Sequence, residues 1–134
     1  TALVYRGDDG IDKLTTTGHS HIWEVSRGFV TEHDLDPADL GIPRADIQSL
    51  LGADAAHNAS VARAVLVGEP GPVRDIVLLN AAGGLAAYEL SREPELLQEP
   101  IVQRLATQLE RAASVIDSGA ASAKLDEWVA ATNR

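Results

Sequence analysis

ALVYRGDDGIDKLTTTGHS, residues 2–20, joins a short apolar run directly to a polar loop. The four residues from Ala2 to Tyr5 are apolar and Gly7 follows too soon for a helix, so we expect a buried strand. The loop behind it is rich in oxygen-bearing side chains: Asp8, Asp9, Asp12, Thr15, Thr16 and Thr17. Because ligands bind beyond the carboxyl ends of strands in open α/β sheets, this position favours a binding site.

The sequence after this loop predicts a β-hairpin. Residues 22–25 and 29–32 are rich in β-branched and aromatic side chains. They flank a turn signal at residues 26–28, which contains the pair Arg27-Gly28. The first quarter of the chain is therefore expected to be built from strands.

The remainder of the chain shows helical periodicity, interrupted by glycine and proline. Asp54 is a candidate N-cap for a helix that ends near residue 67. We expect further helices at residues 45–51, 73–90, 97–116 and 120–131. The apolar residues of segment 73–90 would occupy nearly the whole circumference of a helix, which predicts a helix buried in the centre of the protein. The chain is expected to form one α/β domain, with short strands and a β-hairpin followed by a helical half.

Composition excludes several functional classes. The 134 residues carry a net charge of -9, and the 11 Lys and Arg form no basic run, so nucleic-acid binding is not expected. The absence of cysteine excludes disulfides and thiolate metal sites. The longest apolar stretch falls well short of the about 20 residues that span a bilayer. A cytoplasmic protein without membrane contact is the expectation.

The aspartates of the polar loop permit two interpretations. Asp8, Asp9 and Asp12 are hard oxygen donors of the kind that Mg²⁺ prefers, and the threonines could donate to phosphate oxygens. Asp-Asp-Gly is also typical of a tight turn in which the aspartates bond to nearby backbone. Spacing alone favours the turn.

Other polar residues have weaker claims to a function. His19, His21 and Asp34 could share one face of the hairpin, which makes a metal site geometrically possible, although a solvated strand explains them better. Asn58 and Asn80 lie in apolar helical segments and need partners, because an unsatisfied polar group costs about 1–3 kcal/mol. We expect both asparagines to tie helices to neighbouring loops.

Four segments in a fixed order carry a family resemblance. They are LVYRGDDGIDKLTTTG (residues 3–18), LGADAAHNA (51–59), VLVGEPGPVRDIVLLNAAGGLAAYEL (65–90) and SVIDSGAASAKLDEW (114–128). Together with the hairpin they resemble the C-terminal part of anthranilate phosphoribosyltransferase over essentially the whole chain. The fold implied is the C-terminal portion of the phosphoribosyltransferase and nucleoside phosphorylase-like α/β domain.

This resemblance implies a reaction. Family members transfer the phosphoribosyl group of 5-phosphoribosyl 1-pyrophosphate to the amine of anthranilate in tryptophan biosynthesis, with Mg²⁺ as cofactor. Intact members are more than twice as long, have an additional N-terminal helical domain, and usually form homodimers. Their glycine-rich pyrophosphate loop would precede Thr1, and the chain lacks methionine. We therefore expect this chain to act with an N-terminal portion of the same enzyme and to be inactive alone.

The resemblance also assigns site residues. Asp12 matches a family aspartate that holds magnesium on the pyrophosphate, whereas Lys13 stands where the family has glutamate. Three explanations are open: Asp8 or Asp9 compensates, Lys13 binds the pyrophosphate directly, or metal affinity is reduced. The metal ligands expected are Asp12, Asp9 and Asp8, and the phosphate-binding residues expected are Lys13, Thr15 and Thr16. No residue of this chain is expected to be a catalytic acid, base or nucleophile.

Three alternatives accompany this hypothesis. A pyrimidine nucleoside phosphorylase-like enzyme would share the fold and also break a bond at an anomeric carbon. A non-catalytic homologue, with Lys13 as the visible lesion, would act as a binding subunit. An acidic helical interaction domain would explain the composition, although it would not explain an aspartate-rich loop directly after a strand.

Overall fold

The computed structural model describes residues 1–133. Within them the chain forms three strands, four α-helices and three short 3₁₀ helices. In chain order these are β1 (Ala2–Gly7), β2 (Ser20–Ser26), β3 (Phe29–Leu35), η1 (Pro37–Leu40), η2 (Ile47–Leu50), α1 (Ala55–Leu66), α2 (Pro72–Arg92), η3 (Pro94–Gln98), α3 (Ile101–Asp117) and α4 (Ala120–Thr132). The predicted α/β class, with strands first and helices after, is confirmed.

The strands form an antiparallel sheet in the order β1-β2-β3. The predicted hairpin joins β2 to β3, with Ser26 paired to Phe29 across the turn. Arg27 and Gly28 both have positive φ, 51° and 81°, which is the backbone of a type I′ turn and matches the twist of the flanking strands. At the far end of the sheet Gly7 pairs with Ser20, so the polar loop leaves and re-enters the sheet at one point.

Strand β1 differs from the buried strand that we expected. Val4 is 55% exposed, and only Gly7 is buried along the whole strand. The reason is topological, because among residues 1–133 the sheet extends from β1 on the β2 side only. Strand β1 is therefore an edge strand, and its outward face meets solvent.

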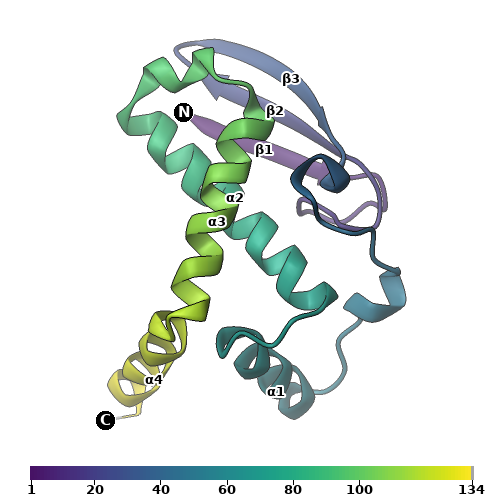
Figure 1. Ribbon diagram of the computed structural model, residues 1–134, viewed down its shortest axis with the longest axis vertical. Helices are drawn as coiled ribbons and strands as arrows, with labels where there is room; N and C mark the ends of the chain where they lie inside the picture. The colour runs from purple at the N-terminus through teal and green to yellow at the C-terminus, as the bar shows by residue number, and fades with distance from the viewer. Residues whose placement is uncertain (134) are drawn as a thin grey trace.

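Helices α2 and α3 pack against the inner face of the sheet (Figure 1). Their main core combines aliphatic side chains from the loop, sheet and helices: Leu14, Ile22, Leu35, Ile42, Leu79, Ala86, Ile101 and Leu105. A second, smaller cluster joins α1, α2 and α3 farther from the sheet: Val65, Leu78, Ala112 and Ile116. Helices α1 and α4 lie at the end of the molecule opposite the sheet (Figure 1).

The helical half follows the sequence prediction with three corrections. Residues 45–51 form only the 3₁₀ turn η2, capped by the side chain of Asp46. The long amphipathic helix begins at Ile101 instead of residue 97, because Pro94 and Pro100 divide the preceding segment into η3 and a break. Helix α2 is buried along one face only, since Tyr88 on its other side is 53% exposed.

Three further observations concern the start of α1, the exposure of α4 and the apolar content of the helices. Asp54 caps α1 by accepting a hydrogen bond from the backbone of His57, as expected. Trp128 on α4 is 66% exposed, so it is not a core residue of this chain. Among residues 1–133, no helix has the length and apolar content needed to cross a bilayer.

One charged pair is buried between the sheet and α3. Arg104 donates two hydrogen bonds to Glu24, at 2.6 and 2.9 Å, and both residues are at most 5% exposed. His33 adds a contact to Glu24 at 3.2 Å from the neighbouring strand. Burial opposes ionisation of Glu24, but the hydrogen bonds and charge of Arg104, with a smaller contribution from His33, keep its pKa below the ordinary value.

Candidate functional site

The loop between β1 and β2 is closed by its own backbone. Gly7 donates to the carbonyl of Ile11 at 3.1 Å, and Gly10 donates back to Gly7 at 3.0 Å. Asp8 donates to the carbonyl of His19 at 2.9 Å, which ties the start of the loop to its end. The aspartate-rich segment therefore has a defined conformation beside the end of β1.

Asp9 serves as the internal anchor of this loop. Its Oδ2 accepts hydrogen bonds from the hydroxyls of Thr15 and Thr17, at 2.6 and 2.7 Å, and its Oδ1 accepts from the backbone of Ile11 at 3.2 Å. Partial burial opposes ionisation, but these hydrogen bonds outweigh it and keep the pKa of Asp9 below its ordinary value. For Asp9, the turn interpretation describes what the structure contains.

Thr15 and Thr16 are fully buried, with 0% of each side chain exposed. Thr15 bonds to Asp9, and its backbone donates to the Ser20 hydroxyl at 2.9 Å. The hydroxyl of Thr16 has no hydrogen-bond partner within residues 1–133. Both side chains face the protein interior in this chain, and phosphate binding by them stays a prediction.

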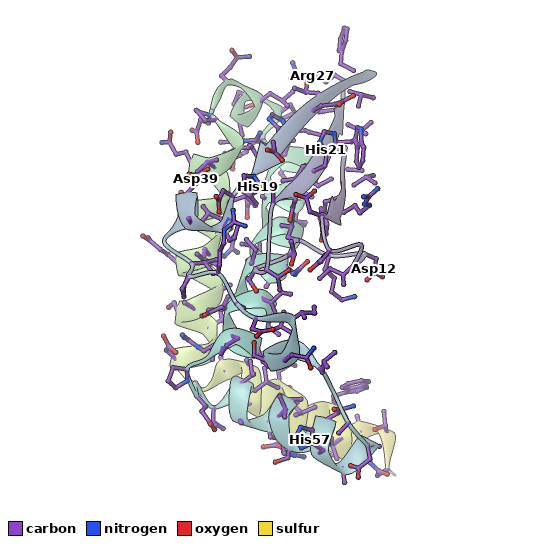
Figure 2. The ribbon with its side chains drawn as sticks, turned by 90° about the vertical axis from the view of Figure 1, so that its right-hand side faces the viewer. Asp12, His19, His21, Arg27, Asp39 and His57 are labelled. Atoms are coloured by element: carbon purple, nitrogen blue, oxygen red, sulfur yellow. The ribbon has the colours of Figure 1, made fainter. Side chains whose placement is uncertain are left out.

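Asp12 and Lys13 behave differently, because both side chains are exposed to solvent. Figure 2 shows Asp12 on the outside of the loop. The Lys13 ammonium donates to Oδ1 of Asp12 at 2.6 Å, and the two side chains are 57% and 89% exposed. The hydrogen bond from Lys13, and then its charge, lower the pKa of Asp12. The pair is thus a preformed ion pair at the surface.

Both residues line a cavity of about 740 Å³. The other wall is apolar and comes from η2, its C-cap residue and α2: Ile47, Leu50, Leu51, Val73, Ile76 and Val77. Asn80 also lines the cavity, at the place where α2 meets the loop. An apolar wall facing a few convergent polar groups is typical of a small-molecule site.

Asn80 fixes the loop to α2. Its side chain accepts a hydrogen bond from the backbone N–H of Leu14 at 3.0 Å and donates to the Leu14 carbonyl at 2.8 Å. It also donates to the carbonyl of Ile76 at 2.9 Å within its own helix. The expectation that Asn80 ties a helix to a loop is confirmed. Asn58 does the same locally, with bonds to both backbone groups of Ala53.

The alternative metal site on the hairpin is not formed. His19 pairs with Asp34 at 3.2 Å, whereas His21 pairs with Glu32 at 3.1 Å. Across residues 1–133, no three His, Asp or Glu side chains come together as a ligand group, and this includes the aspartates of the loop. Metal binding by Asp8, Asp9 and Asp12 therefore stays a prediction that needs ligands from outside the chain.

Gly7 provides a direct test of how tightly this loop is packed. A Cβ added there would lie 2.9 Å from two carbons of Thr15, too close for real side chains. We expect Gly7→Ala to destabilise the chain by about 1–3 kcal/mol through overpacking. Urea unfolding followed by circular dichroism measures this effect. Gly84→Ala is the matched control, because a Cβ there meets open space, and equal stability of the two variants would contradict the prediction.

A family comparison assigns the class. Residues 1–122 match the glycosyl transferase family, a/b domain, and the chain belongs to this family. The chain is 67% identical, over 132 residues, to the anthranilate phosphoribosyltransferase of Leifsonia xyli subsp. xyli, which covers 98% of this chain and 38% of that protein. The enzyme of the same name from Thermobifida fusca is 55% identical over 128 residues, 96% of this chain and 35% of that protein.

Solved structures agree with these relatives. Anthranilate phosphoribosyltransferase from Thermus thermophilus has a TM-score of 0.75 and 32% identity, covering 96% of this chain and 35% of that one. A Saccharomyces cerevisiae enzyme of the same name, in complex with PRPP and Mg, has a TM-score of 0.75 over 92% of this chain and 33% of that one; at 18% identity it supports the fold alone. The resemblance stated from the sequence is confirmed, and the chain spans little more than a third of the relatives' length.

Proposed function

We propose that this chain is part of an enzyme that transfers the phosphoribosyl group of phosphoribosyl pyrophosphate to the amine of anthranilate, a step of tryptophan biosynthesis. The observation that carries the proposal is 67% identity over 98% of the chain to relatives named for this activity. The cavity beside Asp12 and Lys13 supports it, because the loop that carries both residues resembles the family except at Lys13, and both side chains are exposed at the cavity.

The geometry suggests how the loop contributes. As pyrophosphate leaves, negative charge collects on its oxygens while the anomeric carbon becomes cationic, so nearby cations and donors stabilise the transition state. Lys13 places an ammonium at the cavity, held there by Asp12. Asn80 of α2 holds the adjacent backbone at Leu14, so the loop that carries Lys13 is anchored to α2 beside the cavity.

Magnesium is the expected cofactor, and the donors fit it unequally. When bound, Mg²⁺ would supply further charge neutralisation at the departing pyrophosphate. Asp8 is an exposed carboxylate and fits the preference of Mg²⁺ for oxygen, whereas the exposed carboxylate of Asp12 is already paired with Lys13. Asp9 fits less well, because Thr15, Thr17 and the backbone of Ile11 already use both of its oxygens.

The proposal includes the remaining partners. The complete enzyme contains an N-terminal portion that supplies the rest of the substrate site, forms a homodimer, and works in the cytoplasm. Phosphoribosyl pyrophosphate and anthranilate are its small-molecule partners, with neither nucleic acid nor membrane involved. The net charge of -9 supports the exclusion of nucleic acid.

Anthranilate fluorescence tests the activity directly. We expect the complete enzyme to consume the fluorescence when phosphoribosyl pyrophosphate and Mg²⁺ are both added, and the 134-residue chain alone to leave it unchanged. Omitting the sugar pyrophosphate is the control for bleaching. A folded complete enzyme that leaves anthranilate intact would refute the transfer.

One observation favours a second candidate, a homologue that binds without catalysis. Lys13 pairs with Asp12, the carboxylate that the family uses to hold metal. In such a homologue, this lysine would be the substitution that abolishes catalysis. In that case phosphoribosyl pyrophosphate would bind without turnover, and the variant Lys13→Glu would restore turnover. An assay of pyrimidine nucleoside phosphorolysis in the same samples tests the other alternative, a pyrimidine nucleoside phosphorylase-like enzyme with the same fold.

A further inference from the structure

The Asp12–Lys13 ion pair has a second consequence, which rests on the proposed function. The chain contains two lysines, Lys13 and Lys124. Lys124 pairs with Glu127 on the surface of α4, whereas Lys13 pairs with Asp12 at the mouth of the cavity. Only the Lys13 ammonium is therefore placed to meet a ligand that enters this cavity.

An ammonium at this position competes with a metal ion. A divalent cation that binds Asp12 must displace the Lys13 ammonium or lie about 4 Å from it, where two like charges repel even in water. That repulsion corresponds to binding weakened by about 10- to 30-fold. Asp12 alone is thus a poor metal ligand as long as Lys13 keeps its place.

The carboxylate of Asp9 does not offset this competition. Asp9 uses its oxygens for Thr15 and Thr17, and loosening them would undo the loop. Because Asn80 fixes the backbone of Leu14, the backbone of its chain neighbour Lys13 is also held beside the cavity. The backbone that carries the carboxylate and its cation is thereby anchored beside the cavity.

The Lys13 ammonium has donors to spare. It carries three N–H groups, and the bond to Asp12 uses one of them. Both side chains are more than half exposed, so an incoming phosphate oxygen can reach the ammonium without breaking that bond. A phosphate and Asp12 can share the same cation.

We propose that Lys13 replaces a divalent cation at Asp12: its ammonium bridges Asp12 to a phosphate oxygen of phosphoribosyl pyrophosphate, so that the enzyme binds this substrate with a reduced requirement for metal. Lys13 is thereby the residue that sets the metal dependence of the site. Any magnesium that takes part is held mainly by the substrate and by residues other than Asp12.

Two measurements on the complete enzyme test this proposal. Electron paramagnetic resonance with Mn²⁺ as the probe gives the metal affinity of wild type, Lys13→Met, Lys13→Glu and the control Lys124→Met. Calorimetry gives the affinity for phosphoribosyl pyrophosphate with metal removed by a chelator. We expect Lys13→Met to bind Mn²⁺ about 10- to 30-fold more tightly, Lys13→Glu more tightly still, and Lys124→Met like wild type.

The substrate titration should move in the opposite direction. Wild type and Lys124→Met are expected to bind the metal-free substrate, and Lys13→Met to bind it about tenfold more weakly, because a charge-assisted hydrogen bond is lost. Unchanged Mn²⁺ affinity in Lys13→Met would overturn the inference while the proposed function stood. Failure of wild type to bind the substrate with or without metal would overturn both.

Discussion

Arg104→Met is expected to lower the free energy of unfolding by about 3–5 kcal/mol, because it leaves Glu24 charged and without its partner in the core. Glu24 is 3% exposed, and both of its oxygens accept hydrogen bonds from the guanidinium. His33 alone cannot replace a bidentate partner. Urea unfolding of the chain at low concentration, followed by circular dichroism, measures the change.

A control on the same helix separates burial from charge. Arg111 pairs with Glu89 at 2.7 Å, but its side chain is 53% exposed, so Arg111→Met should cost less than about 1 kcal/mol. The double variant Glu24→Leu with Arg104→Met should recover most of the loss, because it removes both charges from the core. Similar costs for the two arginine variants would contradict the prediction.

Titration with acid provides an independent readout of the same pair. Since the pKa of Glu24 in the folded chain lies below the ordinary value of 4.5, its contribution is fully present above that value. The contribution is lost as the pH falls through the lowered pKa of the folded state. Wild type should therefore lose more stability on acidification than the Glu24→Leu, Arg104→Met double variant.

Asn80→Leu is expected to destabilise the chain by about 2–4 kcal/mol, the cost of leaving two backbone groups of Leu14 without partners in a partly buried place. Leucine keeps the branching and the number of heavy atoms of asparagine but cannot form hydrogen bonds, so the variant removes all three bonds of the amide. In the complete enzyme the same change should weaken the binding of phosphoribosyl pyrophosphate, since the backbone beside Lys13 is no longer held. Unfolding and calorimetry measure the two effects.

The matched control for this substitution is Asn133→Leu. The amide of Asn133 donates to a single exposed carbonyl, that of Val129, so its loss should cost only a few tenths of a kcal/mol. If Asn80→Leu kept wild-type stability but lost substrate affinity, the amide would position the loop without stabilising the fold. Full retention of both properties would contradict the assigned role.

Local signals in the sequence predicted local structure well. Arg27-Gly28 indicated a hairpin turn because few backbone conformations suit that pair, and Asp54 indicated a helix start because its side chain satisfies an N–H of the first turn. Such local signals did not predict that the side chains of Asp12 and Lys13 are exposed. A loop has no regular repeat, so its sequence does not tell which side chains point to solvent.

Contacts between residues far apart in the chain could not be predicted from the sequence. Glu24 and Arg104 are 80 residues apart, and no local pattern links a strand carboxylate to that arginine of α3. The apolar wall of the cavity comes from η2 and α2, which the sequence places far from Asp12. Asn80 was the exception, because a polar residue in an apolar helix must find a partner, although the partner itself was not predicted.

The free edge of β1 has a practical consequence for work with the chain alone. An edge strand that exposes Val4 and contains neither lysine nor proline is a template for pairing with a second chain. Edge strand β3 is better protected, since Glu32 and Asp34 repel their own copies. Purified chain at high concentration should therefore aggregate through β1, and dilution or a charged residue in place of Val4 is the remedy.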